Sequence, residues 1–204
     1  MLPSQLPDIG NRICAWDTET SGLHPEDLVI PAPLEGEICC RVSTVSVAWL
    51  NDDDEVEAYA FAFDQGLRDK LYQPSMLELL DDPNLPESEW VALLEWLQKR
   101  RLVAHNVKFD TWMTLAGTRH WPGLDLEPNV VWDSAIGQKV LDPIDLIRLK
   151  DTAVRLGLDD GHEADSAEVL ANWVKKAKLG KNIGTKTNPR YDLVPWSVME
   201  PYAR

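Results

Sequence analysis

Two acidic residues follow an apolar run near the start of the chain, and their spacing is suited to metal chemistry. Residues 13–16 (ICAW) are typical of a buried strand, and Asp17 and Glu19 come directly after them. Side chains two residues apart on a strand point to the same face, so both carboxylates would project together. Two like charges this close repel each other unless a cation lies between them. Hard ions such as Mg²⁺ or Mn²⁺ bind carboxylates together with substrate phosphates, so the pair predicts metal-dependent phosphate chemistry. The alternative is that both acids are ordinary polar residues where a strand meets a turn.

A second group of polar residues follows the short apolar segment 102–104, where a strand meets a helix. Asn106 and Asp110 are four residues apart and so lie on the same side of a helix. Ligands gather where strands end and helices begin on an open α/β sheet. If this strand lies beside the first one, Asp110 approaches the first pair of acids, and three carboxylates suit two divalent ions. Taken alone, Asp110 would be a solvated helix acid, and His105 and Asn106 would be turn and capping residues.

The rest of the chain must form a sheet that brings these two places together. Residues 41–63 alternate between apolar and polar around a charged centre, which predicts a β-hairpin. Residues 102–104 and 129–132 are short, apolar and typical of buried strands. Apolar periodicity predicts helices at 88–100, 107–117, 134–141, 146–156, 164–179 and 195–204. This order predicts an α/β domain with a mixed sheet, an antiparallel hairpin plus parallel strands, flanked by helices.

Charge limits the class of partner. The chain has 204 residues and a net charge of −14, which fits one domain and argues against a broad basic surface for nucleic acid. A narrow site in which metal ions supply positive charge remains open. Residues 173–190 reverse the trend, because they contain six basic residues and no acid (Lys175, Lys176, Lys178, Lys181, Lys186 and Arg190). This segment could guide the phosphates of a single strand, or it could be a solvated helix end and loop.

The cell compartment is indicated by what the sequence lacks. The first thirty residues do not resemble a signal peptide, and no run approaches 18 apolar residues. The three cysteines contain no Cys-x-x-Cys pair, which favours reduced thiols. We therefore expect a cytoplasmic protein that does not interact with membranes.

Three stretches resemble, in order, the motifs of the DEDD 3′–5′ exonucleases, which have a ribonuclease H-like fold. Residues 17–23 (DTETSGL) resemble the first motif, and 105–110 (HNVKFD) resemble the second. Residues 149–157 (LKDTAVRLG) are similar to the stretch before the third motif in proofreading domains of family A DNA polymerases. Tyr202 looks like the start of that third motif, Tyr-x-x-x-Asp. The resemblance covers nearly the whole chain and implies the proofreading domain, of the tyrosine subfamily, of a phage or bacterial polymerase.

The resemblance also implies a role for each motif residue. Asp17 would bridge two Mg²⁺ or Mn²⁺ ions, with Glu19 on one and Asp110 on the other. Tyr202 would orient the attacking water, and Glu19 would also hydrogen-bond the terminal 3′-hydroxyl. Leu23 and Phe109 would pack against terminal bases, although for Phe109 a place in the core is the favoured alternative. The substrate-binding set expected on this basis is Thr18, Thr20, Leu23, His105, Asn106, Phe109, Lys181 and Lys186.

The third motif is where the chain departs from the family. The chain ends at Arg204, so the Asp expected four residues after Tyr202 is absent. We therefore expect one exonuclease domain, 1–204, that is incomplete at its C-terminus, with weak, Mn²⁺-favoured activity at best. Asp133 and Asp165 are weak substitutes, because Asp133 is better placed to cap a helix and Asp165 lies in a hydrophilic turn.

Three functions remain open from the sequence. The leading hypothesis is a proofreading 3′–5′ exodeoxyribonuclease that takes the 3′ end of single-stranded DNA. Its polymerase domain would lie in the same full-length chain or in a partner, in the host cytoplasm if a phage encodes it. The alternatives are a stand-alone RNA-trimming exoribonuclease and a catalytically silent module that binds DNA or a polymerase.

Overall fold

The protein is described here from a computed structural model. The residues that the structure describes are 1–22, 41–64, 83–143, 148–158, 168–173, 175 and 191–203. The candidate residues Leu23, Asp165, Lys181 and Lys186 lie outside these ranges, as does most of the basic segment 173–190.

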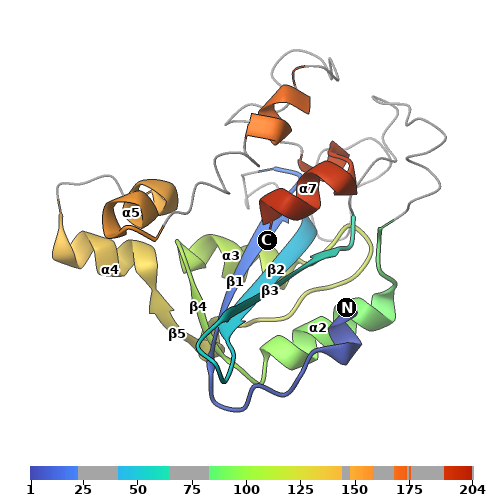
Figure 1. The fold of residues 1–204 in the computed structure, drawn as a ribbon. Helices are drawn as coiled ribbons and strands as arrows, with labels where there is room; N and C mark the ends of the chain where they lie inside the picture. Colours follow the sequence, from blue (N-terminus) through green and yellow to red (C-terminus); the bar gives the residue numbers. More distant parts are fainter. Residues whose placement is uncertain are drawn as a thin grey trace.

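A five-stranded mixed sheet forms the centre of the molecule (Figure 1). Its strands are β1 (Ile13–Thr20), β2 (Val42–Leu50), β3 (Val56–Ala62), β4 (Arg101–Ala104) and β5 (Val130–Asp133), in the spatial order β3-β2-β1-β4-β5. β1, β2 and β3 are antiparallel, whereas β1, β4 and β5 run parallel. The predicted hairpin, both short strands and the mixed α/β sheet are therefore confirmed. β1, which carries Asp17 and Glu19, pairs with β4, which precedes the second motif, so the condition set from the sequence is met.

Helices connect the parallel strands and cover the sheet. They are α2 (Glu87–Leu97), α3 (Val107–Ala116), α4 (Ser134–Leu141), α5 (Leu149–Leu156) and α7 (Trp196–Ala203), and residues 168–173 are also helical. Short 3₁₀ turns lie at η1 (Pro3–Gln5), η3 (Glu127–Asn129) and η4 (Tyr191–Leu193). The helix predicted at 88–100 ends three residues early, at Leu97, and the one predicted from 195 begins at Trp196, directly after Pro195. Within the described ranges, no helix has the length and apolar character needed to span a bilayer.

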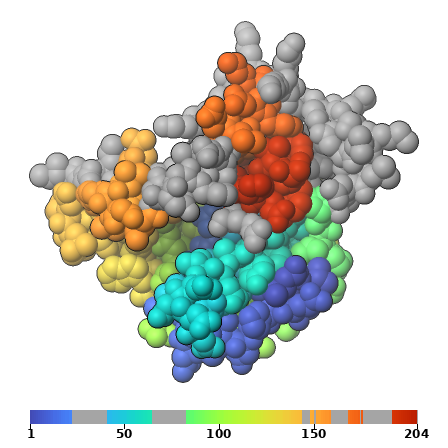
Figure 2. Space-filling view, in the orientation of Figure 1, coloured from blue at the N-terminus to red at the C-terminus, as the bar shows by residue number. Residues whose placement is uncertain are grey.

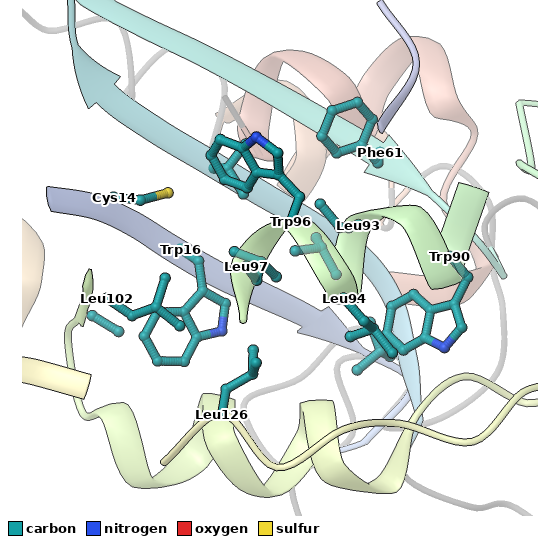
Figure 3. Packing of buried hydrophobic residues seen from close by; sticks show 14 of the residues in the cluster. Cys14, Trp16, Phe61, Trp90, Leu93, Leu94, Trp96, Leu97, Leu102 and Leu126 are labelled. Atoms are coloured by element: carbon teal, nitrogen blue, oxygen red, sulfur yellow. The ribbon is translucent and has the colours of Figure 1, made fainter. Parts of the chain in front are cut away.

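One face of the sheet carries the main core. Burial alternates along β1, so that Cys14 and Trp16 point inward while their neighbours point to the other face. Leu93 and Leu97 of α2 pack against this face, in the same cluster as Leu102 of β4 (Figure 3). Burying this apolar surface fixes the register of the sheet, because a shift of one residue would turn every core side chain to the opposite face.

The other face of the sheet is more open and belongs to the C-terminal part of the chain. α7 contacts β2 and β3, and the space-filling view shows it seated against them (Figure 2). A second, smaller apolar cluster lies here, formed by Leu170, Val194 and Met199. Tyr191 and Tyr202 pack against this second cluster.

Candidate active site

A cleft of about 770 Å³ lies on the open face, along β1 and beside the end of the parallel strand β4. Its lining comes from the beginning, the middle and the end of the chain. Among the residues predicted from the sequence, it includes Asp17, Thr18, Glu19, His105, Phe109, Asp110 and Tyr202. The fold therefore brings the three motif regions together in one place.

Asp17 and Glu19 reach the cleft because of the two-residue period of β1. Asp17 is exposed and Glu19 is half-buried, while Thr18 between them points into the protein. The negative charges of Asp17 and Glu19 both act on the hydroxyl of Tyr202 and raise its pKa, after burial, which has the largest effect. The acids of the first motif and the tyrosine of the third are thus close enough to interact electrostatically.

Asp110 is buried, with 2% of its surface exposed, and its carboxylate is held by Thr18. The backbone N–H of Thr18 donates to Asp110 Oδ1 over 3.0 Å, and the Thr18 hydroxyl donates to the same oxygen over 2.8 Å. Burial, and after it the charge of Asp17, raise the pKa of Asp110, the bonds from Thr18 partly oppose this, and the net pKa is about 8. A carboxyl with this pKa is largely protonated at neutral pH unless a cation is present.

A second acid, Asp133, joins the start of α3, the helix that carries Asp110, to the start of α4. Asp133 Oδ2 accepts the N–H of Val107 over 3.0 Å, and Oδ1 accepts those of Asn106 and Ala135 over 3.0 and 2.8 Å. Asn106 adopts a left-handed conformation (φ +64°), which turns the chain sharply into α3. The predicted capping role of Asp133 is confirmed. This residue also anchors the start of α3.

Tyr202 has a partner that the sequence did not indicate. Its ring centroid lies 6.0 Å from that of Tyr191, and the two hydroxyls are hydrogen-bonded. Burial and the charge of Glu19 raise the pKa of both hydroxyls, so both stay protonated at neutral pH. Tyr191 belongs to no motif and stands in a segment without periodicity, so no sequence signal pointed to it.

The donor set suits a hard divalent ion. Asp17, Glu19 and Asp110 offer only carboxylate oxygens, and the effect of Asp17 on the pKa of Asp110 shows a repulsion that a cation would relieve. Among the described residues, however, no three His, Cys, Asp or Glu side chains already form a metal-binding group. The chemistry of the acids fits such an ion, and their arrangement is not yet that of a complete coordination shell.

Three of the residues expected to bind substrate do not simply face the cleft. The Thr20 hydroxyl donates to the carbonyl of Gly22 over 2.5 Å and is buried, so it closes the turn after β1. Asn106 is exposed and lies outside the described lining of the cleft. Phe109 borders the cleft but packs against the main core, which was the favoured alternative to base stacking.

His105 borders the cleft from the end of β4. Its Nδ1 lies 2.9 Å from the hydroxyl of Ser134, at the start of α4. Ser134 also lines the cleft, together with Trp132 of β5. Neither was assigned to the site from the sequence.

Comparisons with known proteins find a distant similarity of structure. No protein-family model and no curated protein matches the sequence. Among solved structures, E. coli exonuclease I in complex with a dT13 oligonucleotide is 16% identical, with a TM-score of 0.43, over 83% of this chain and 42% of that one. Exonuclease I from Methylocaldum szegediense is 14% identical, with a TM-score of 0.45, over 75% of this chain and 37% of that one. The chain thus spans less than half the length of these structures, and the similarity concerns the fold alone.

Proposed function

We propose that the cleft hydrolyses the phosphodiester at the 3′ end of single-stranded DNA and releases nucleotides in the 3′–5′ direction with Mg²⁺ or Mn²⁺. One observation carries this proposal. Asp17 and Glu19 from β1, Asp110 from α3 and Tyr202 from α7 line a single cleft although they are far apart in the sequence. An all-oxygen acidic group beside a protonated tyrosine suits phosphate chemistry.

Each residue would have a distinct part in the reaction. Asp17, Glu19 and Asp110 would hold divalent ions, which neutralise phosphate charge and make a water nucleophilic. Thr18 keeps the Asp110 carboxylate directed at the cleft through its two hydrogen bonds. Tyr202, whose raised pKa keeps its proton, would donate a hydrogen bond and orient the attacking water, and it would not act as a base. Glu19 would accept a hydrogen bond from the terminal 3′-hydroxyl, which would favour free 3′ ends.

The choice of DNA and the link to a polymerase are also proposed. They are supported by the resemblance of residues 149–157 to proofreading domains, since these residues form α5 and its C-cap, and Leu149 borders the cleft. The polymerase would lie in the same chain or in a partner chain. A second candidate, a silent DNA-binding module, is favoured by the absence of a complete three-acid metal group among the described residues.

A degradation assay on a 5′-labelled single strand tests the proposal. We expect a ladder of products shortened from the 3′ end in Mg²⁺ or Mn²⁺, and no products in EDTA. Asp17→Asn and Asp110→Asn should each lower the rate by at least about 100-fold, because each removes an ionised ligand. Asp125→Asn is the matched control, because Asp125 is an exposed acid outside the described lining of the cleft.

Each result has a clear meaning. Full activity of Asp17→Asn or Asp110→Asn would refute the assignment of the cleft. Binding of the strand without any release of nucleotides in either metal would favour the silent module. Faster degradation of the same sequence as RNA would favour the exoribonuclease.

A further inference from the structure

One tryptophan, Trp132, lies in the same row of paired strand residues as the small side chains that line the cleft. Trp132 of β5 pairs with Val103 of β4, Val103 pairs with Ala15 of β1, and Ala15 pairs with Ala48 of β2. Paired residues on neighbouring strands point to the same face, so these side chains form a single row across the sheet. Asp17 lies two residues beyond Ala15 and therefore projects from the same face.

The side chains in this row are small near the acids and large at β5. The side chains of Ala15 and Ala48 are methyl groups, and both line the cleft. Trp132 lines the same cleft and is 57% exposed, which is unusual for so large an apolar side chain. The open face thus presents a shallow apolar trough that runs from the acids to an indole ring.

The ring of Trp132 is supported from one side. A Cβ atom built on Gly137 of α4 would clash with the indole ring of Trp132, so the absence of a side chain there lets the ring rest against this helix. Gly137 is buried beneath the ring. The indole is therefore backed by a helix on one side while more than half of the residue remains accessible.

We propose that Trp132 stacks on a base of the bound single strand, a few nucleotides from its 3′ end. This inference rests on the proposed function and assigns the residue that holds the strand upstream of the reaction. Two strand spacings and two residues of rise separate Trp132 from Asp17, which corresponds to about 12 Å. With about 3.4 Å per stacked nucleotide, this distance reaches beyond the terminal nucleotide. Stacking on an aromatic ring tolerates any base, as removal of arbitrary nucleotides requires.

Binding of an oligothymidylate with phosphorothioate linkages at its 3′ end tests this role without turnover. In Mg²⁺, Trp132→Ala should weaken binding about tenfold, whereas Trp132→Phe should retain most of it. Trp112→Ala is the matched control, because Trp112 is 44% exposed on α3 and lies outside the described lining of the cleft. Gly137→Ala should also weaken binding, because a Cβ atom at this position displaces the ring.

An abasic version of the probe, lacking the bases at the second to fourth positions from the 3′ end, separates stacking from other contacts. The wild type should lose about the same tenfold on this probe, and Trp132→Ala should lose nothing further. Equal binding by Trp132→Ala and Trp112→Ala would overturn the inference, as would an equal loss on the abasic probe by wild type and Trp132→Ala.

The same data distinguish this inference from the proposed function. If the wild type degrades DNA while Trp132→Ala behaves like the control, only the stacking role fails. If the wild type binds through Trp132 but releases no nucleotides, only the hydrolytic function fails. If the wild type does not bind the strand, both fail.

Discussion

Asp110 combines two properties that conflict in the absence of a cation. Its carboxyl is almost fully buried, yet it faces the negative charge of Asp17. Protons and divalent ions therefore compete for this group, since either one removes the cost of a buried charge. Metal binding at this site should release a proton at neutral pH.

The pH dependence of stability follows from the raised pKa of Asp110. Between about pH 4 and pH 8 the carboxyl ionises in the unfolded chain but stays protonated in the folded protein, so stability falls as pH rises. In EDTA, Asp110→Asn should match the wild type at pH 4 and melt about 5 °C higher at pH 8, because Asn does not titrate. Melting curves followed by circular dichroism at both pH values measure this. A constant difference between the two proteins across the range would contradict the shift. Excess Mg²⁺ at pH 8 should stabilise the wild type and leave Asp110→Asn unchanged.

The sequence predicts which acidic side chains face the cleft better than it predicts the residues that support them. The period of a strand alone places Asp17 and Glu19 on one face. The bonds from Thr18 to Asp110 depend on where α3 lies against β1, and the exposure of Trp132 depends on the helix behind it. Such contacts between distant segments leave no local pattern, so the sequence did not indicate them.

Asp133 stabilises two helices, because it caps α4 and also accepts hydrogen bonds from the N–H groups at the start of α3. Asp133→Ala should lower the free energy of unfolding by about 3 kcal/mol, since it leaves donors at two helix ends without a partner. Urea denaturation measures this value. Asp125→Ala is the comparison, because Asp125 accepts one N–H, from Glu127, and is exposed. Its loss should be less than about 1 kcal/mol. Equal losses for the two variants would show that Asp133 does not join the two helices.

The order and type of the elements were largely predictable. Alternation identified the hairpin, and short apolar runs identified β4 and β5. The pairing of β1 with β4, which forms the cleft, was only a conditional expectation, since local patterns do not specify which strands become neighbours. The limits of α2 and α7 differed by up to a turn because helix ends depend on packing as well as on propensity.

The charge of the whole molecule predicts an unusual response to salt. A net charge of −14 repels a polyanion at long range, so few phosphate contacts should contribute to affinity. We expect affinity for the phosphorothioate oligothymidylate to fall less than about tenfold between about 50 and 200 mM salt, compared with 10³ to 10⁵ for proteins that make many phosphate contacts. Fluorescence anisotropy titrations at constant Mg²⁺ measure the slope. A steep slope that disappears in the double variant Lys181→Ala, Lys186→Ala would instead assign the binding to the basic segment.

The division of the apolar packing into two clusters has a consequence for local unfolding. The acids stand on the sheet above the main core, whereas Tyr202 packs against the separate cluster of Leu170, Val194 and Met199. A small packing unit can open as a cooperative subunit at a lower free energy than the global transition. Opening of this unit would withdraw the tyrosine while the carboxylates stay in place. Under the proposed function, the chain would then pass between a cleft that includes the tyrosine and an acidic cleft that lacks it, with no change in its central sheet.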